Sequence, residues 1–556
     1  MANLTKYLKP YTKEVVIGPI FKLIEAIFEL IVPLVMAKII DVGIKNSDMP
    51  YILKMGAVMI GLGILGWCSA LVCQYSAAKA SQGFGTQLRS ALYRHINSFS
   101  HREIDTMGVP SLITRMTNDI NALQLAVAML IRLVVRCPFL VIGATIMSMM
   151  IDIKLSLIFL ASIPLIGGTI YLIMHKSVPF FRNMQKSLDK VSKITRENLE
   201  GVRVVRAFNR QKTENQRFDE EMDTLTGISI ASGKISSALN PMTYVIVNLA
   251  IVLIIWFGGH QVNSGDLTQG QIVALVNYMS QILMALMAFA NVIVIFTKAQ
   301  ASQNRVSEVL DIQSTIFNKA DNKADKSVNQ NADKVAFCDA GLSYEKDGEY
   351  ALESISFTVK SGQLVGIIGG TGCGKTSLIN LIPRFYDVTV GQVLVDGIDV
   401  REENLKVLRQ KIGIVPQEAV LFSGTLRENM NMGKENATDE EIARALRVAQ
   451  AEEFVAKWPN RYDTKIEQGG RNLSGGQKQR LCLARALIKN PEILILDDSA
   501  SALDYATDLA LRRAIRKECH NMPDLIAKPS MLLNSLKHVL PTWYRAVVRS
   551  FMLGWK

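Results

Sequence analysis

Long apolar stretches alternate with charged stretches in the first half of the chain. Crossing about 30 Å of hydrocarbon takes roughly 20 apolar residues in a helix, and six segments come close to that length. They run approximately from Val15 to Ile40, Ile52 to Cys73, Ala128 to Met150, Leu155 to Met174, Met242 to Val262 and Ile272 to Phe296. Because buried helices of a soluble protein do not follow one another in such a series, we predict a six-helix transmembrane domain in residues 1–310.

Positive charge is unevenly distributed among the links between these stretches. The links after the first, third and fifth stretches are short and poor in Lys and Arg. Those after the second and fourth stretches are long and contain many, including Arg89, Arg94, Arg115, Lys186, Arg203 and Arg206. Basic residues accumulate on the cytoplasmic side of membrane proteins, so both long links and both termini are predicted to face the cytoplasm.

Ionisable residues interrupt the first apolar stretch at Lys22, Glu25 and Glu29. Charged groups at membrane depth are costly, so they are expected to be paired or to face a water-filled pathway. Two interpretations stay open: a Lys22–Glu25 pair with Glu29 bonded to another helix, or contact with a substrate. Arg132 and Arg136, at the start of the third stretch, are interpreted as anchors that reach the lipid headgroups.

The pattern changes at about residue 311. Residues 311–334 are polar, charged and nearly repetitive, which is typical of a linker. From residue 335 onward, short apolar strands alternate with helical segments, as in an α/β domain with a largely parallel sheet. We assign residues 335–522 to this second domain.

Composition agrees with a membrane protein that has a polar domain. The chain of 556 residues is 49% hydrophobic and 20% charged, with a formal net charge of +12. The basic residues are spread over the links rather than gathered in one patch with aromatic residues, so no nucleic-acid partner is expected. The seven cysteines show no metal-ligand spacing and are predicted to be free thiols.

The first chemical motif follows a predicted buried strand, Leu364 to Ile368. Its residues match the pattern G-x-x-x-x-G-K-[ST] and are Gly369, Gly370, Thr371, Gly372, Cys373, Gly374, Lys375 and Thr376, followed by Ser377. Glycines allow backbone N–H groups to converge on phosphates, and the lysine reaches the β- and γ-phosphate oxygens. The threonine hydroxyl is placed to bind Mg²⁺, so the motif predicts a phosphate loop.

A second apolar strand, Ile493 to Leu496, ends at Asp497. In a parallel sheet this carboxylate would lie beside the phosphate loop, where it can hold the metal. The two motifs together predict a P-loop ATPase with ATP and Mg²⁺ as its cofactors.

Between these motifs lies the sequence LSGGQ, which contains Ser474, Gly475, Gly476 and Gln477. This is the signature of ABC ATPases, and residues 1 to about 520 resemble a multidrug- or lipid-type ABC exporter half-transporter. The resemblance implies a RecA-like core with a helical subdomain, fused to the transmembrane domain. It also implies a dimer, in which the signature binds the γ-phosphate of ATP held by the phosphate loop of the other subunit.

The same resemblance gives roles to other matching positions. Tyr344 resembles the aromatic residue that stacks on adenine, and Gln417 the glutamine that contacts Mg²⁺ and the γ-phosphate. Asp504 ends a segment, SALD, that crosses the dimer interface. Segments around Ser111 to Ile120 and Gly201 to Phe208 resemble the coupling helices that dock onto the ATPase domains.

The chain departs from the family at the position after Asp497. Family members carry a glutamate there that polarises the attacking water, whereas this chain has Asp498. A catalytic group displaced by about 1 Å can lose on the order of a hundredfold in rate, so the site is expected to turn over poorly. Asp498 beside an intact signature, with Gln468 where relatives often carry Glu, resembles the slow-site subunit of a heterodimeric exporter.

The larger departure lies in residues 523–556. The family requires a strand that ends in a histidine about thirty residues after the catalytic carboxylate, but Pro523 and Pro529 argue against a central strand here. We interpret the ATPase domain as incomplete and the tail as a shifted reading frame or premature end. The alternative is an amphipathic helix at the membrane surface, supported by its basic and aromatic residues.

These features predict an ATP-driven exporter of lipophilic small molecules, lipids or peptides in a cell membrane, most simply a bacterial one. The chain would be one half of a dimer, with a heterodimer favoured over a homodimer. The alternative is a catalytically impaired nucleotide-binding subunit that completes a partner's ATPase site.

Overall fold

The computed structural model describes residues 4–316, 332–345, 348–370, 372–498, 503–518 and 524–529. The chain forms two compact units, which we call the helical unit and the α/β unit. The helical unit contains Met1–Asn97 and Gly108–Ile312, and the α/β unit contains Ser98–Met107 together with the chain from Gln313 onward. The short segment Ser98–Met107 therefore belongs structurally to the second unit although the chain on both sides of it belongs to the first.

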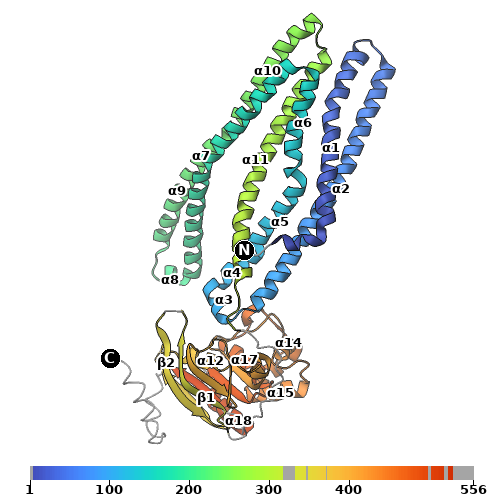
Figure 1. Cartoon of the computed structure of the whole chain (residues 1–556). Coiled ribbons are helices and arrows are strands. Elements are labelled where there is room, and N and C mark those ends of the chain that lie inside the picture. Colours follow the sequence, from blue (N-terminus) through green and yellow to red (C-terminus); the bar gives the residue numbers. More distant parts are fainter. Residues whose placement is uncertain are drawn as a thin grey trace. The chain divides into compact units, whose positions relative to one another are not determined.

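Long helices make up the helical unit (Figure 1). In chain order its elements are η1 (Leu4–Tyr7), η2 (Lys9–Tyr11), α1 (Thr12–Lys38), η3 (Ile39–Ile44), α2 (Met49–Asn97), α4 (Val109–Thr114), η4 (Arg115–Asp119), α5 (Ile120–Met129), η5 (Leu130–Val134), α6 (Arg136–Ile151), α7 (Ile153–Glu200), α8 (Val202–Ala207), α9 (Gln211–Ser237), α10 (Leu239–Ser264) and α11 (Gln269–Asp311). At 1.5 Å per residue, the 48 residues of α7 span about 72 Å, more than twice the thickness of a hydrocarbon core. The helices therefore continue well beyond the membrane, as their sequence pattern predicts.

Five helical stretches in the described part of the chain are long and apolar enough to cross a membrane. They are Met49–Asn97, Val109–Ile151, Ile153–Glu200, Gln211–Ser264 and Gln269–Asp311. The predicted first span is α1, a helix of 27 residues that packs along α2 but does not meet these limits. Its charged residues Lys22, Glu25 and Glu29 explain the difference, and its assignment as a sixth span stays a prediction.

Close packing and capped helix ends fix the arrangement of the helical unit. Phe159, Ile254 and Tyr278 are completely buried in one apolar cluster formed mainly by α1, α6, α7, α10 and α11. The Tyr278 hydroxyl donates to the carbonyl of Leu30 over 2.7 Å, which satisfies its polar atom inside this core. Asp41 of η3 accepts from the backbone N–H of Gly270 over 2.8 Å, so η3 is tied to the first turn of α11.

The α/β unit contains an antiparallel sheet and a parallel sheet. The antiparallel sheet has the order β2-β1-β4-β5 and is built from β1 (Val335–Ser343), β2 (Tyr350–Val359), β4 (Val390–Val395) and β5 (Ile398–Asp399). The parallel sheet has the order β3-β10-β9-β6 and is built from β3 (Leu364–Gly369), β6 (Ile412–Val415), β9 (Ile493–Asp497) and β10 (Asp524–Pro529). A short pair, β7 (Gly424–Thr425) and β8 (Lys465–Ile466), lies outside both sheets.

Helices complete the α/β unit. They are α3 (His101–Met107), α12 (Lys375–Leu381), α13 (Leu405–Lys411), α14 (Leu426–Asn431), α15 (Asp439–Val448), α16 (Glu452–Ala456), η6 (Arg461–Asp463), η7 (Gln468–Gly470), α17 (Gly475–Leu487) and α18 (Tyr505–Glu518). Every residue of β9 is buried, as expected for a strand of a parallel sheet that is covered on both faces. One apolar cluster joins β9 to α15, α17 and α18, and a second joins it to β1, β4 and α12.

Strand β10 corrects one sequence-based prediction. Residues 524–529 form an inner strand that pairs in parallel with β3 on one side and β9 on the other. The prolines did not prevent this, because Pro529 is the last residue of the strand and Pro523 precedes its first residue. The parallel sheet therefore extends past residue 522, while the rest of the predicted tail and most of the predicted linker, residues 311–334, lie outside the described residues.

Candidate nucleotide site

The phosphate loop connects β3 to α12. Gly372 and Gly374 have φ angles of +83° and +84°, a left-handed conformation that suits glycine. A Cβ at Gly374 would also lie 2.9 Å from the carbonyl oxygen of Ala351, so the loop has no room for a side chain there. The predicted loop residue Thr371 lies outside the described residues.

Lys375 is the first residue of α12, and its side chain folds back over the loop. Its Nζ donates to the carbonyl oxygens of Gly369 and Gly370 over 3.0 and 2.6 Å. The ammonium is thereby held above the loop that would surround the phosphates, which is the position that the motif predicts. Gly369 ends β3 and Lys375 begins α12, and the described loop residues between them are Gly370, Gly372, Cys373 and Gly374.

Thr376 and Asp497 come together although 121 residues separate them. The Thr376 hydroxyl donates to Asp497 Oδ2 over 2.8 Å. Two neighbouring oxygens of an octahedral Mg²⁺ shell, each roughly 2.0–2.1 Å from the metal, lie about 2.9 Å apart. The pair therefore fits two adjacent positions of a magnesium shell. Among the described residues no group of three or more His, Cys, Asp or Glu could hold a metal.

Burial raises the pKa of the Asp497 carboxyl, while donation from Thr376 and the nearby charge of Lys375 act in the opposite direction. Asp497 is only 5% exposed. A buried carboxylate without a full counter-charge is stabilised by a bound cation. The electrostatics of this position therefore favour a divalent metal.

The carboxyl ends of the parallel strands bring the predicted catalytic residues to one edge of the sheet. Asp498 directly follows β9 and has a φ angle of +47°, a conformation that aspartate tolerates better than most residues. Gln417 lies two residues beyond β6, the neighbour of β9, and is exposed. The sheet thus places both residues at the edge where the phosphate loop begins.

Tyr344 lies beside the phosphate loop, just after β1. Its hydroxyl lies 2.7 Å from the Ser377 hydroxyl of α12, and its ring makes an edge-to-face contact with Tyr386 at 5.2 Å between centroids. The residue is 42% exposed, which leaves ring surface available for stacking. Its role in stacking on adenine stays a prediction.

The signature motif forms the start of α17. Ser474 caps the helix: its Oγ accepts from the backbone N–H of Gln477 over 3.3 Å, and the Gln477 side chain accepts from the Ser474 N–H over 2.9 Å. Ser474 and Gly475 are exposed, and Gly476 is partly buried. A preorganised helix start with exposed glycine backbone is suited to binding an anion from outside the chain.

Asp504 is placed at the start of α18. Its carboxylate accepts from the backbone N–H of Thr507 over 3.2 Å, and this hydrogen bond lowers the pKa of Asp504. The residues before it, Ser501 and Ala502, lie outside the described residues.

An aromatic contact that sequence analysis missed lies beside Tyr344. The ring of His101 on α3 stacks on Phe385, with centroids 4.4 Å apart, and Tyr386 donates its hydroxyl proton to Asp105 of α3. Burial lowers the pKa of His101, and burial together with the Asp105 contact raises the pKa of Tyr386. Within the α/β unit, α3 therefore packs on the Phe385–Tyr386 turn.

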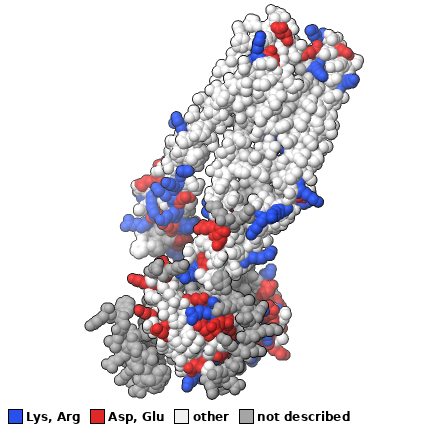
Figure 2. All heavy atoms as spheres, viewed as in Figure 1, with Lys and Arg blue, Asp and Glu red and all other residues white. Residues whose placement is uncertain are grey.

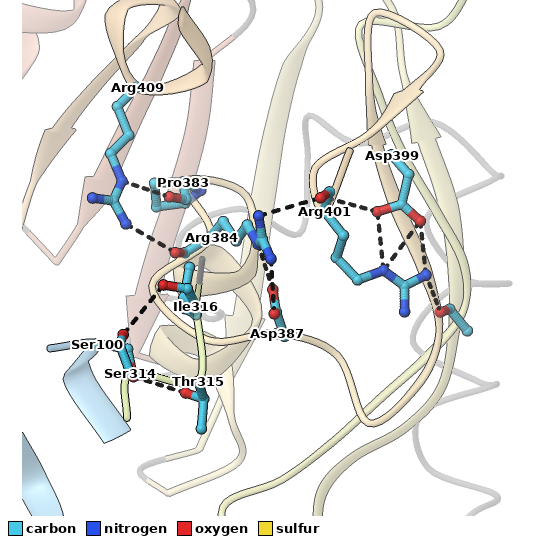
Figure 3. Close-up of polar contacts among 11 residues, drawn as sticks. Ser100, Ser314, Thr315, Ile316, Pro383, Arg384, Asp387, Asp399, Arg401 and Arg409 are labelled. Carbon is cyan, nitrogen blue, oxygen red and sulfur yellow. Dashed lines mark hydrogen bonds and ion pairs between the residues drawn. The ribbon is translucent and has the colours of Figure 1, made fainter. Parts of the chain in front are cut away.

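Figure 3 shows Arg409 bonded to Pro383 and Arg384, the two residues that precede Phe385 in the chain. Arg409 donates to the carbonyl oxygens of Pro383 and Arg384 over 3.1 and 3.0 Å, and its guanidinium lies 5.4 Å from the centre of the Phe385 ring. Arg384 itself is buried and pairs with Asp387 over 2.6 Å. Two adjacent aromatic residues in a loop were the only sequence signal for this surface.

Both predicted coupling segments form short helical elements of the helical unit. Residues 111–120 form the end of α4, the π-helical η4 and the first residue of α5, all within the helical unit. The second predicted segment contains the short helix α8, which also belongs to the helical unit. The role of both segments as coupling helices stays a prediction.

Comparison with known families identifies both parts of the chain. Residues 15–286 match the ABC transporter transmembrane region, and residues 352–501 match the ABC transporter ATPase family. The first match includes most of α1 and therefore the stretch with Lys22, Glu25 and Glu29.

Individual relatives extend over nearly the whole chain. An uncharacterized ABC transporter ATP-binding protein of Bacillus subtilis, YfiB, is 37% identical over 93% of this chain and 89% of its own length. An ATP-dependent lipid A-core flippase of Syntrophus aciditrophicus is 31% identical over 85% of this chain and 78% of its own length. The structure of a bacterial Atm1-family ABC exporter with ATP bound has the same fold, with a TM-score of 0.74, 21% identity, and coverage of 96% of this chain and 92% of that one.

Three findings agree with one another. Both family models match, a relative above 30% identity covers nearly the whole chain, and Thr376 pairs with Asp497 beside the phosphate loop. The chain belongs to the ABC transporter family, with an exporter-type transmembrane region fused to its ATPase domain.

Proposed function

We propose that this membrane protein is one half of a dimeric, ATP-driven exporter. The observation that carries the proposal is the Thr376–Asp497 pair at the phosphate loop, in a chain whose described residues also form five helical stretches long and apolar enough to cross a membrane. ATP binding is coupled to transport in this architecture, and ABC exporters act as dimers. The ATPase domain and both termini would then face the cytoplasm of a bacterial cell membrane, in contact with its lipids.

The residues of this chain suggest how nucleotide is held. Tyr344 would stack on adenine, and the loop backbone and Lys375 would surround the phosphates. Thr376, Asp497 and Gln417 would hold Mg²⁺, which would supply positive charge to the phosphate oxygens. Ser474, Gly475, Gly476, Gln477 and Asp504 would contribute to the site that faces the other subunit.

Contacts within the α/β unit suggest how nucleotide binding reaches α3. Tyr344 contacts both the phosphate-loop helix, through Ser377, and the edge of Tyr386. Tyr386 in turn bonds to Asp105 of α3. A movement of Tyr344 upon adenine stacking would therefore act on α3 through one intervening ring, and α3 is covalently continuous with the long helix α2.

A second candidate function concerns the chain's own ATP site. Asp498 in place of the family glutamate withdraws the carboxylate by the length of one methylene, while the signature helix keeps its full capping box. This combination favours a heterodimer in which this chain hydrolyses slowly and completes the active site of its partner. The exported substrate would be a lipophilic small molecule, a lipid or a peptide.

The proposal is tested by ATP turnover of the purified chain in lipid vesicles, alone and together with the half-transporter that co-purifies with it. Transport coupled to ATP hydrolysis is expected for the pair. If the chain alone hydrolyses ATP at a normal exporter rate and loses this activity in Lys375→Ala, the impaired-subunit hypothesis is wrong. If neither form hydrolyses ATP or moves any lipophilic probe, the exporter proposal is wrong.

A further inference from the structure

Five ionisable side chains form a cluster inside the helical unit, which we call the charged cluster: Lys22, Glu25 and Glu29 of α1, Arg132 of η5 and Arg136 of α6. In Figure 2 the visible surface of the helical unit is almost free of charged atoms over most of its length, and charge gathers towards its ends. Four of its members are buried or partly buried, with Lys22 9%, Glu25 18% and Arg136 24% exposed at the side chain, whereas the side chain of Glu29 is 38% exposed. Charges at such a depth are costly and mark functional sites in membrane proteins.

Both carboxylates of the charged cluster are already paired. Lys22 Nζ lies 2.7 Å from each carboxylate oxygen of Glu25, and Arg136 Nη2 donates to Glu29 Oε2 over 2.7 Å. The structural interpretation of these acidic residues is thus confirmed. The interpretation of Arg136 as a lipid-headgroup anchor is wrong, because its guanidinium turns inward to α1.

Arg132 supplies a third positive charge. Among the described residues it has no ion-pair or hydrogen-bond partner, and its Nε is buried. Arg136 Nε is also buried without a partner. Three cations therefore face two carboxylates, and two buried N–H donors lack acceptors, an arrangement that costs free energy unless an anion completes it.

The cluster converges on one place between three helices. Lys22, Glu25, Arg132 and Arg136 all lie within electrostatic reach of Cys73, a completely buried residue of α2. Arg132 lies in the π-helical turn Leu130–Val134, and such wide turns inside α-helices occur often at functional sites. On the side of α11, Gln281 donates to the carbonyl oxygen of Glu29 over 3.3 Å, and its own side-chain oxygen is buried without a partner.

We propose that the charged cluster binds the anionic headgroup of an amphiphilic substrate, a phosphate or carboxylate attached to a lipophilic body. Arg132 and Arg136 would donate their free N–H groups to the anion, and Lys22 would contribute charge. Guanidinium groups suit this role because they bind such anions through two parallel hydrogen bonds. The apolar surroundings would receive the lipophilic body, and the inference rests on the proposed export function, whose substrate class it narrows.

The test measures binding without ATP, so its result is independent of whether the chain hydrolyses ATP. The purified chain is placed in phosphatidylcholine nanodiscs and titrated with fluorescent phosphatidic acid, fluorescent palmitate or fluorescent phosphatidylcholine of matched chain length. We expect both anionic probes to bind at least about tenfold more tightly than the zwitterionic lipid. Inorganic phosphate should not compete if the lipophilic body is needed, and competition at millimolar concentration would assign the site to free phosphate and overturn the proposal.

Substitutions of opposite expected sign make the test specific. Arg132→Gln should weaken binding of phosphatidic acid about tenfold, because one charge-assisted hydrogen bond is lost. Glu29→Gln should strengthen it several-fold, because Arg136 is released from its present partner. Lys154→Gln removes an exposed cation at the start of α7 and serves as the matched control, with no expected change.

The thermal midpoint of each variant shows whether it is folded. Equal binding of all three lipids by the unaltered chain would overturn the proposal. So would unchanged binding in a folded Arg132→Gln variant. If Arg132→Gln does not fold, Glu29→Gln decides: stronger anion binding supports the proposal, and equal or weaker binding contradicts it.

Discussion

The phosphate-loop region and the signature region of this chain differ in how completely they keep the features of their family. The phosphate-loop region retains Lys375 and the Thr376–Asp497 pair but carries Asp498 where a glutamate is usual. The signature region keeps LSGGQ and a helix cap with both of its reciprocal hydrogen bonds. Because the two regions lie on different elements, β3 and β9 in one case and α17 in the other, one can weaken without the other. Under the proposed function, this chain would hydrolyse ATP slowly and still complete the ATPase site of its partner.

The largest expected effect follows from blocking the signature region. Gly475→Asp would place a carboxylate where the partner's γ-phosphate binds and should lower ATP turnover of the complex with the co-purified half-transporter by about a thousandfold. The same substitution at Gly227, an exposed glycine of α9 with open space around it, is the control and should have little effect. Equal turnover in the two variants would show that the signature of this chain serves no active site.

Repair of the phosphate-loop region should have the next largest effect. Asp498→Glu restores the missing methylene and is expected to raise hydrolysis at this chain's own site by about a hundredfold. Single-turnover hydrolysis of nucleotide bound by this chain measures the effect, and Asp497→Glu is the control that should lower it instead. No gain in Asp498→Glu would mean that the aspartate is not what limits this site.

Loss of the contact between Tyr386 and α3 should have a smaller effect, which falls on the coupling of ATP hydrolysis to transport. Tyr386→Phe keeps the ring but removes the hydroxyl that bonds to Asp105, a loss of about 1 kcal/mol or roughly fivefold in an equilibrium. Transport per ATP hydrolysed should therefore fall about fivefold while ATP binding stays unchanged. Tyr462→Phe, in η6, is the control, and an equal loss in both variants would remove the special role of Tyr386.

The smallest expected effect is a pH dependence of the α3 contact. Burial lowers the pKa of His101 below its usual 6.5, so the packed ring stays neutral where an unpacked ring would take up a proton. The packing of α3 should thus be fully stable above about pH 6.5 and weaken as the pH falls from there towards the lowered pKa of the folded state. Transport per ATP at pH 5.5 should drop about twofold relative to pH 7.5, and the drop should be absent in His101→Phe. An unchanged pH dependence in that variant would assign it to another group.

More of the nucleotide site could be predicted from the sequence than of the Phe385–Tyr386 turn on which α3 packs. Lys375 and Thr376 lie in one short motif, and Asp497 ends a strand whose place beside the loop follows from parallel sheet geometry. The contact between Asp105 and Tyr386 joins residues 281 positions apart and depends on packing that no local pattern records. Likewise, two prolines argued against β10, but the strand begins after Pro523, ends at Pro529 and pairs with β3 and β9.

In the helical unit, too, a contact between distant residues could not be predicted from the sequence. Apolar length predicted six spans, and among the described residues five helical stretches reach the length and composition of membrane spans. The partner of Glu29 could not be read from the sequence, because Arg136 lies 107 residues away on another helix. Spacing along one helix, in contrast, predicted the Lys22–Glu25 pair.

The most direct test of unequal ATP sites measures ATP turnover by the complex with the co-purified half-transporter. In this test the phosphate-loop lysine is replaced by alanine in one subunit at a time. If this chain's own ATP site is the slow one, Lys375→Ala in this chain leaves at least about half of the turnover. The equivalent change in the partner then removes nearly all of it. Equal losses from the two substitutions would contradict the proposal of unequal sites and show that both ATP sites hydrolyse alike.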